Sequence, residues 1–523
     1  MKVTLEGLKS MHDTTDKRYM ELPFTRNSRM KLANDVLEGT TLKKLATVKE
    51  EALAILKPTR EELKKVASVT DRVIKHISHA LNSQDIPVLE IEPQGSTGIK
   101  QTQLAGDFDV DVFIILDRGL IKGKGSKKAI RSFNKELFTG YINNLLIPTS
   151  REALKAKKVT FSYAEHPYLT ITVDGIKFDL VFCYQVTKED IKRSGIYSAM
   201  DRTPLHSIFV RDHLDINQKD DVRLMKAFFK AHHVYGDRSA CGRMGFIGYA
   251  TELLIFHFGT LENLLVNFDM LCKVPIDYHG RPDSLVARNN RFSNDYLIIT
   301  DPTDPSRNVG SSIDKRAVLH ARKQVNEFLK EPNVDFFITR SIPSPPNMDP
   351  HFQVVTFNNS QDVHYTIVRD KLYKLGNNIS TSLERETTGE ERFGTLTHEV
   401  VFPRKNNMVA LAFHVSNPII SDSYVHRGPK STIAPERIRG FLDKHPNAQV
   451  DSDDYYYIIV KREETTFTRA ASRLIQELLD IDGLTTRSGS PEIPIVISPA
   501  EHLGRQAIHV LKTMVIPHAN ERA

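Results

Sequence analysis

Three aspartates alternate with apolar residues in the run from Asp107 to Leu116, and this spacing could support metal-dependent chemistry. Side chains at positions i and i+2 of a strand share a face, so Asp107, Asp109 and Asp111 are predicted to project together. Like charges on one face repel unless a cation lies among them. Carboxylate oxygens suit Mg²⁺, and a pair of such ions suits phosphoryl transfer. A strand edge that carries solvated acids is the alternative interpretation.

A further acid lies in a second apolar run, from Ile176 to Phe182. If this run is a strand beside the first one, Asp179 joins the same cluster as Asp109 and Asp111. Upstream, Gly95-Ser96 follows a strand-like run. Glycine permits a close backbone approach and serine donates a hydrogen bond, as a phosphate-binding loop requires. The combination predicts a metal and phosphate site at one edge of a sheet.

The elements that must position these residues form a mixed α/β unit that ends near residue 195. A capping box of Thr59 and Glu62 begins a helix with one apolar stripe, the first strong helix of the chain, and residues 1 to about 42 are expected to be a polar extension. The other elements expected in this unit are strands at 88–91 and 107–116, a basic helical stretch, and a hairpin of strands 168–173 and 176–184 that turns at Asp174-Gly175.

The remainder of the chain is predicted to be helical first and mixed afterwards. A period of 3.6 in the apolar residues predicts helices over 222–233, 246–258 and 317–329. A proline-rich segment at 341–347 marks a linker. Beyond the linker, the pattern predicts an α+β region with strands at 364–368, 398–402, 408–415 and 455–460 and a helix at 468–479.

Composition excludes several classes of protein. The 523 residues predict three or four domains at about 150 residues each, and 40% apolar with 26% charged residues is ordinary for a folded chain. Collagen-like and wholly disordered chains are therefore excluded. No apolar run approaches the ~18 residues of a membrane span, and no secretory signal is recognised. Three scattered cysteines predict neither a disulfide framework nor a zinc cluster, so we expect a cytoplasmic protein with reduced thiols.

Positive charge is concentrated between Arg118 and Lys158. This stretch holds eleven basic and two acidic residues, while the whole chain has a formal net charge of +6. Clustered positive charge attracts polyanions and raises their association rate. A solvated surface and a phosphate-facing surface are both consistent with this run, and the sequence alone leaves the two interpretations open.

The Gly-Ser loop followed by Asp109-x-Asp111 resembles the nucleotidyltransferase superfamily that includes DNA polymerase β, poly(A) polymerases and CCA-adding enzymes. Further segments narrow the resemblance to the archaeal-type (class I) tRNA CCA-adding nucleotidyltransferases. They follow in one order from about residue 58 to residue 330, with fainter similarity beyond. The segments that carry the narrower resemblance are 165–168, 178–184, 198–206, 221–226, 234–236, 245–249 and 301–309.

The resemblance implies an α+β, multidomain fold. Its parts would be an N-terminal extension (1–57), a polymerase β-like nucleotidyltransferase head (58–197), a helical neck that completes the nucleotide pocket (198–330), and an α+β body and tail that bind tRNA (331–523).

It also implies roles for individual residues. The catalytic, metal-binding acids would be Asp109, Asp111 and Asp179, with Mg²⁺ as the cofactor. Arg307 would read the incoming base together with the tRNA backbone. Lys100, the basic residue of the Gly-Ser loop, would also bind the nucleotide. The residues that would contact the nucleotide's triphosphate are Ser96, Thr203, His206, Lys226 and Tyr235.

The expected activity is template-independent addition of C, C and A to the 3′ end of tRNA from CTP and ATP, with pyrophosphate released. A related transferase that makes oligoadenylate, poly(A) or a partial CCA end is one alternative. A non-catalytic RNA-binding protein is another, although the three intact acids argue against it. The expected partners are tRNA, CTP and ATP, with no membrane. The oligomeric state stays open, a homodimer included.

Overall fold

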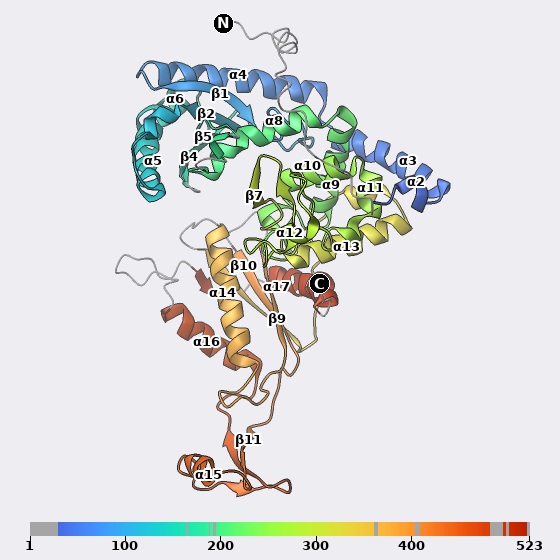
Figure 1. The fold of residues 1–523 in the computed structure, drawn as a ribbon, viewed down its shortest axis with the longest axis vertical. Helices are drawn as coiled ribbons and strands as arrows, with labels where there is room; N and C mark the ends of the chain where they lie inside the picture. Colours follow the sequence, from blue (N-terminus) through green and yellow to red (C-terminus); the bar gives the residue numbers. More distant parts are fainter. Residues whose placement is uncertain are drawn as a thin grey trace.

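The chain forms an elongated molecule (Figure 1). The computed structural model describes residues 30–163, 166–187, 189–191, 195–359, 365–402, 408–481, 495–497 and 501–519. The first 29 residues of the expected extension therefore lie outside the described part. Residues 60–184 form one end of the molecule and residues 423–461 form the other, with helical and mixed layers between them.

The head is a five-stranded sheet with helices on one face. The strand order is β1-β2-β5-β4-β3. Strands β2 and β5 run parallel, and the other neighbouring strands of this sheet are antiparallel. The strands are β1 (Val88–Gln94), β2 (Asp109–Leu116), β3 (Lys158–Tyr163), β4 (Pro167–Val173) and β5 (Ile176–Tyr184). The helices are α4 (Arg60–Asn82), η3 (Arg118–Ile121), α5 (Lys127–Tyr141), the π-helical turn η4 (Ile142–Leu146) and α6 (Ile147–Glu152).

The alternation predicted for the first aspartate run is confirmed within β2. Val110, Val112 and Ile114 are buried in the core that β2 shares with α4 and α5. The opposite face begins with Asp109 and Asp111. The strand starts at Asp109, so Asp107 lies outside it and does not share the strand's face as expected.

Two local sequence signals of the head are confirmed. The Thr59 and Glu62 capping box closes reciprocally, with the Glu62 N–H donating to Thr59 Oγ1 and the Thr59 N–H donating to Glu62 Oε2. The hairpin turns at Asp174-Gly175, whose φ angles are 50° and 82°. Both angles are positive, as a two-residue type I′ turn requires.

The neck is helical. Its two central helices, α9 (Ile216–Ala231) and α10 (Gly248–Phe258), are buried on nearly every side by the other neck elements. It also contains a short β6–β7 hairpin that the helical pattern did not predict. Its elements are η5 (Ala199–Arg202), α8 (Thr203–His213), α9 (Ile216–Ala231), η6 (Gly236–Arg238), α10 (Gly248–Phe258), α11 (Leu261–Val266), η7 (Phe268–Met270), α12 (Asp283–Ala287), β6 (Thr300–Asp301), β7 (Asp304–Asn308), α13 (Lys315–Lys330) and η8 (Val334–Phe337).

Two helices, α2 (Ala33–Val36) and α3 (Gly39–Leu56), precede the first helix that the sequence predicted. The expectation that the chain is a polar extension up to about residue 42 is therefore wrong over these elements. Leu45, Val48 and Ala52 of α3 are buried in the neck core beside α9. The sequence pattern did not predict α3 because the apolar face of this helix is narrow. Such a face is recognised as part of a core only when a partner helix covers it.

The body packs helices against a sheet of order β14-β8-β10-β9, and the tail is a small sheet of order β11-β13-β12. The body consists of β8 (Phe352–Asn359), α14 (Tyr365–Leu383), β9 (Leu396–Val401), β10 (Met408–Val415), α16 (Phe467–Ile481), β14 (Ile495–Ile497), α17 (Glu501–Val510), the π-helical turn η9 (Leu511–Val515) and η10 (Ile516–His518). The tail consists of β11 (Ser423–Lys430), α15 (Pro435–Leu442), β12 (Gln449–Val450) and β13 (Tyr455–Lys461).

The strand predicted at 364–368 is wrong. Residue 364 lies outside the described residues, and Tyr365 begins the long helix α14. Val368, Leu372 and Leu375 are buried at helical spacing. The short apolar run at 364–368 was compatible with a strand or a helix, and the spacing of the residues after it identifies a helix. The α+β, multidomain fold class is confirmed. Within the described ranges, no helix combines the length and apolarity needed to cross a membrane.

Candidate active site

The carboxylate cluster forms where β2 and β5 run side by side. Their parallel register pairs Asp111 with Asp179 and Asp109 with Lys177. The Lys177 ammonium lies 3.5 Å from Asp109 Oδ2 and 3.1 Å from Asp179 Oδ2. The structure thus places the three predicted acids at one edge of the sheet. Asp107 instead forms an ion pair with Lys230 on α9.

The environment of Asp111 opposes a bare negative charge. Burial raises the pKa of its carboxyl to about 7, and the neighbouring carboxylates of Asp179 and Asp109 act in the same direction. Lys177 and Lys100 only partly offset this effect. A carboxyl group with a raised pKa beside like charges indicates a place that a cation would stabilise.

Thr170 holds Asp179 in place and was missed from the sequence. Its hydroxyl donates to Asp179 Oδ1 at 2.6 Å, across the β4–β5 hairpin. A signal for it was present, because the Asp174-Gly175 turn fixes the hairpin register and sets residue 170 opposite residue 179.

The chemistry of the donors, and not their spacing in this structure, suits a divalent cation. Three carboxylates at one edge offer the oxygen ligands that Mg²⁺ prefers, and a lysine ammonium already lies between two of them. In the part of the chain that the structure describes, however, no group of three or more acidic, histidine or cysteine side chains is gathered closely enough to hold a metal. The fit therefore rests on the chemistry of the donors and on the raised pKa of Asp111.

The Gly-Ser loop packs directly against this carboxylate edge. Gly95 has a φ of +71°, and a Cβ atom there would lie 2.5 Å from Asp111 Oδ2. A Cβ on Gly98 would lie 2.3 Å from the Pro93 carbonyl oxygen. Only glycine fits at either position. The sequence therefore folds Ser96 into a tight turn beside Asp111, as a phosphate-binding loop requires.

A buried carboxylate joins the head loop to the neck. Glu252 of α10 accepts hydrogen bonds from Lys100 Nζ at 2.7 Å, Lys226 Nζ at 3.1 Å and Thr102 Oγ1 at 2.8 Å. Its side chain is 1% exposed. Burial alone would raise the pKa of Glu252, but the two ammonium groups hold it at about 2. Sequence reasoning missed Glu252, because it lies within an otherwise apolar helix and its partners are 152 and 26 positions away.

Lys226 and Lys230 share one face of α9, but their charges are engaged separately. Lys226 is buried against Glu252, whereas Lys230 pairs with Asp107 and lies 5.3 Å from the centre of the Tyr235 ring. The predicted pair of cations is thus divided between two acids. Of the predicted triphosphate contacts, Lys100 and Lys226 are brought together and Tyr235 lies next to them.

A second constellation surrounds Asp301 on β6. Its Oδ2 lies 2.8 Å from His206 Nε2 and 2.8 Å from Arg307 Nη1. These two groups hold the pKa of Asp301 far below its usual range, although burial acts in the opposite direction. The His206 ring stacks on Tyr249 with centroids 4.0 Å apart. The structure therefore brings His206 and Arg307 together through an acid that the sequence reasoning had not assigned.

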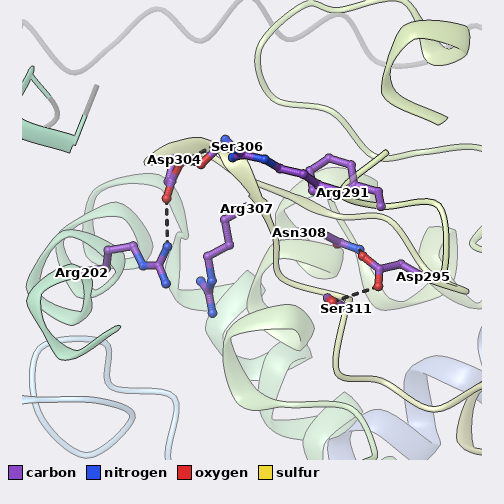
Figure 2. A pocket seen from close by; sticks show the side chains of 9 residues that line it. Arg202, Arg291, Asp295, Asp304, Ser306, Arg307, Asn308 and Ser311 are labelled. Atoms are coloured by element: carbon purple, nitrogen blue, oxygen red, sulfur yellow. Dashed lines mark hydrogen bonds and ion pairs between the residues drawn. The ribbon is translucent and has the colours of Figure 1, made fainter. Parts of the chain in front are cut away.

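Thr203 is the first residue of α8, directly after Arg202. Arg202 and Arg307 both line a pocket of about 290 Å³ (Figure 2). Figure 2 shows their guanidinium groups pointing into the same space. The Gly-Ser turn, the carboxylate cluster and the arginine-lined pocket lie around one head and neck, an arrangement that suits a nucleotidyltransferase.

Comparison with known proteins agrees with this class. Residues 220–338 match the family model described as tRNA nucleotidyltransferase, second domain. The CCA-adding enzyme of Saccharolobus islandicus is 28% identical over 418 residues, which are 80% of this chain and 89% of that protein. The enzymes of Methanocaldococcus jannaschii and Thermoplasma acidophilum, both also called CCA-adding, are 30% and 33% identical over 55% of this chain and 60% and 58% of their own lengths.

Among solved structures, Escherichia coli CdnC with ATP is similar at a TM-score of 0.39 and 16% identity, over 56% of this chain and 94% of that one. A likeness of that size carries no argument of its own. The curated relatives and the family model carry the comparison: residues 220–338 match a tRNA nucleotidyltransferase domain, and the chain is similar to archaeal CCA-adding enzymes.

Proposed function

We propose that this chain adds C, C and A to the 3′ end of tRNA, using CTP and ATP. The observation that carries the proposal is the parallel register of Asp111 and Asp179 beside the Gly95-Ser96 turn, in a chain whose relatives named CCA-adding enzymes match it over 80% of its length.

In this proposal Asp109, Asp111 and Asp179 hold divalent cations, with Mg²⁺ as the ion that carboxylate oxygens favour. When bound, such ions supply Lewis-acid stabilisation of charge on phosphoryl oxygens. The chain's own contribution is orientation. Thr170 fixes one oxygen of Asp179, and the Gly95 turn presents Ser96 to the phosphates next to Asp111.

The triphosphate would lie over Ser96, Thr203 and the buried pair Lys100 and Lys226. These two lysines carry one more positive charge than Glu252 neutralises. The surplus favours a polyanion at the junction of head and neck, and Glu252 keeps both ammonium groups in position before the nucleotide arrives. Tyr235, next to Lys226, would complete this wall.

Arg307 would read the base. Cytosine and adenine both place an amino group beside a ring nitrogen that accepts a hydrogen bond, whereas uracil and guanine place a carbonyl beside a ring N–H. A guanidinium offers fixed planar donors, and Asp301 holds this one from behind at 2.8 Å. His206, on the same carboxylate, would brace that arrangement.

The decisive experiment incubates the protein with tRNA that lacks its last three nucleotides, with Mg²⁺ and each NTP separately. Incorporation of C from CTP alone, followed by A once two C residues are present, is the expected result. Long A tails or addition of A only would indicate a related transferase. Tight tRNA binding without incorporation of any nucleotide would indicate a binding protein.

A further inference from the structure

A second cavity, of about 330 Å³, lies where the neck, the body and the C-terminal segment meet. Helix α13 contributes Lys315 and Arg316 to its wall, and the other walls come from α14, β9 and the residues after α17 (Figure 1). It shares no lining residue with the arginine pocket of Figure 2. None of the described residues that line it carries an acidic side chain. A cavity lined by charges of one sign concentrates ions of the opposite sign, so this one suits an anion.

The acids that offset the charge of Arg316 act on it from outside the cavity. Arg316 Nη1 donates to Glu399 Oε2 at 3.0 Å and to the His398 carbonyl oxygen at 2.9 Å. Glu399 also accepts from the Gly242 N–H at 3.1 Å, and Asp314 accepts from the backbone N–H of Arg316 at 2.9 Å. In the described part of the chain, Nε and Nη2 of Arg316 have no hydrogen-bond partner. These two donors are therefore available to a ligand.

A histidine in the wall of the cavity is held in one orientation. Ser380 Oγ lies 3.2 Å from His398 Nδ1. Gly376 lies one turn before Ser380 on the same face of α14, and a Cβ atom there would lie 2.4 Å from His398 Cδ2 and 2.7 Å from its Nε2. Only glycine lets the ring approach the helix so closely, although glycine destabilises the interior of a helix. The place of this ring is therefore a constraint on the sequence of α14.

The His398 imidazole is a neutral donor toward the cavity. Burial, together with the positive charge of Arg316, lowers the pKa of His398 to about 4, so the ring carries a single proton at neutral pH. With the Ser380 hydroxyl donating to Nδ1, that proton lies on Nε2. Among the described residues, Nε2 has no hydrogen-bond partner. The cavity therefore offers a fixed N–H donor in addition to its ammonium and guanidinium groups.

Apolar side chains form the rest of the wall that matters for a ligand. Leu319 of α13, Leu396 of β9 and Val515 of η9 line the cavity and are buried. Its volume lies at the lower end of the range for small-molecule sites, about 300–1,000 Å³. A phosphate group alone leaves part of this space unfilled, so an organic substituent can lie on the apolar side chains.

We propose that this cavity binds a small phosphomonoester, with its phosphate on Lys315, Arg316 and His398 Nε2 and its organic part on the apolar side chains. Three donors from two elements match the several oxygens of a phosphate better than the two oxygens of a carboxylate. The bound ligand bridges neck, body and C-terminal segment, and so stabilises the folded chain. This site goes beyond the proposed function and does not depend on it.

The test is calorimetric titration of the full chain with phenyl phosphate, in which one ester bond joins a phosphate to an apolar ring. Inorganic phosphate and phenol, titrated in parallel, measure the two halves separately. We expect phenyl phosphate to bind about tenfold more tightly than inorganic phosphate, because only the ester also buries apolar surface, and we expect no binding of phenol. Phenyl phosphate should also raise the Tm. Equal affinity for phosphate and phenyl phosphate, or no binding of either at millimolar concentration, would overturn the proposal.

Three variants locate the site. Lys315→Gln is expected to weaken phenyl phosphate binding about tenfold, and Ser380→Ala several-fold, because the imidazole loses the hydroxyl that orients it. Lys330→Gln, which removes an exposed lysine from the other end of α13, is the matched control and should keep wild-type affinity. Wild-type affinity in Lys315→Gln or in Ser380→Ala would contradict the assignment, and so would an equal loss in all three variants.

The same titration in the presence of saturating tRNA, and separately of CTP, identifies the source of the phosphate. A free phosphomonoester site predicts unchanged affinity for phenyl phosphate in both cases. Competition by tRNA would overturn the proposal and assign the cavity to an RNA phosphate. Competition by CTP would overturn it as well, and would assign the cavity to the nucleotide substrate.

Discussion

Two carboxylates in opposite surroundings show how single residues are used at this site. Glu252 is fully compensated, because two lysines and a threonine hydroxyl surround it. Asp111 lies beside the carboxylates of Asp179 and Asp109, and burial with their repulsion raises its pKa to about 7 against the partial offset of Lys177. The first arrangement gives rigidity without any ligand. The second becomes stable when a cation is supplied, which is the property that a metal-dependent transferase needs.

Replacing either central acid should therefore abolish catalysis without abolishing RNA binding. For Asp111→Asn and, separately, Asp179→Asn, we expect nucleotide addition to fall by about 10²-fold or more, because an amide cannot supply the charge that holds the cation. Single-turnover incorporation and tRNA affinity are the measurements. Asp107→Asn, outside β2 and paired with Lys230, is the control that should stay active. Turnover within about tenfold of wild type in either variant would remove that residue from the site.

Glu252→Gln should affect both stability and nucleotide affinity. Removing its charge leaves two buried ammonium groups uncompensated, at a cost of about 3–5 kcal/mol in the free energy of urea unfolding. In the variant that remains folded, the KM for CTP should change more than the KM for tRNA, and Glu252→Asp should restore part of it. Glu262→Gln is the control, since Lys49 keeps its other partner, Asp221. Equal losses for both substrates would give Glu252 a structural role only.

Arg307→Ala should narrow base selectivity. We expect efficiency with CTP and ATP to fall much more than with UTP and GTP, because an unpaired buried polar group costs about 1–3 kcal/mol only where the match existed. Single-nucleotide incorporation with all four NTPs measures the ratio, and Arg307→Lys, which keeps the charge without the planar donors, should also narrow it. A uniform loss with every NTP would make Arg307 a triphosphate or structural residue.

At the scale of elements, local sequence signals were sufficient to predict a helix, strand or turn where the hydrophobic pattern was long or where the turn required particular residues. The sequence predicted the alternation of β2, the Asp174-Gly175 hairpin and the Thr59 cap. Together these features predicted that Asp179 approaches Asp111. The rest depended on contacts between distant segments. The apolar stripe of α3 is narrow and becomes part of a core only against the neck, and Glu252 is compensated only by distant residues such as Lys100, so the local signal was weak for α3 and absent for Glu252.

The basic segment is exposed on the outer side of the head, where α5 covers the sheet. We expect the joint replacement of Lys122, Lys124, Lys127 and Lys128 by Gln to flatten the salt dependence of tRNA binding, by about one unit of log–log slope or less for each lost phosphate contact. Affinity over a salt series measures this. A variant with four exposed lysines of α3 and α4 replaced (Lys43, Lys44, Lys64 and Lys65) is the control. An unchanged slope would show that the basic segment is a solvated surface that does not contact tRNA phosphates.

At the scale of the molecule, the neck is the part on which the head loop, α3 and the C-terminal segment all pack. The head loop docks on it through Glu252, and α3 packs on α9. The C-terminal segment packs against α13, where His320 faces His518 with ring centroids 6.4 Å apart. These contacts make the neck the common support of segments from both ends of the described chain.

The buried histidines of this support predict a loss of stability in acid. Burial lowers the pKa of His320 to about 3 and that of His232 to about 4, from 6.5. Below pH 6.5 the unfolded chain therefore binds protons that the folded chain refuses, and stability falls by about 1.4 kcal/mol per pH unit for each such histidine. Urea unfolding between pH 7 and pH 5 measures the slope. His320→Leu should reduce it by nearly one histidine's share, and an identical slope would show that His320 does not titrate as described.

The packing of α3 on the neck also determines what happens while the chain is being made. Lys57, at the end of α3, pairs with Asp220 of the neck, 163 positions later. The head lies entirely between these two points, so its residues leave the ribosome while the apolar stripe of α3 still has no partner. Synthesis advances at about 5–20 residues per second, which leaves that stripe uncovered for roughly ten seconds or more. We therefore expect the nascent chain to expose this apolar stripe throughout the interval, until α9 emerges and covers it.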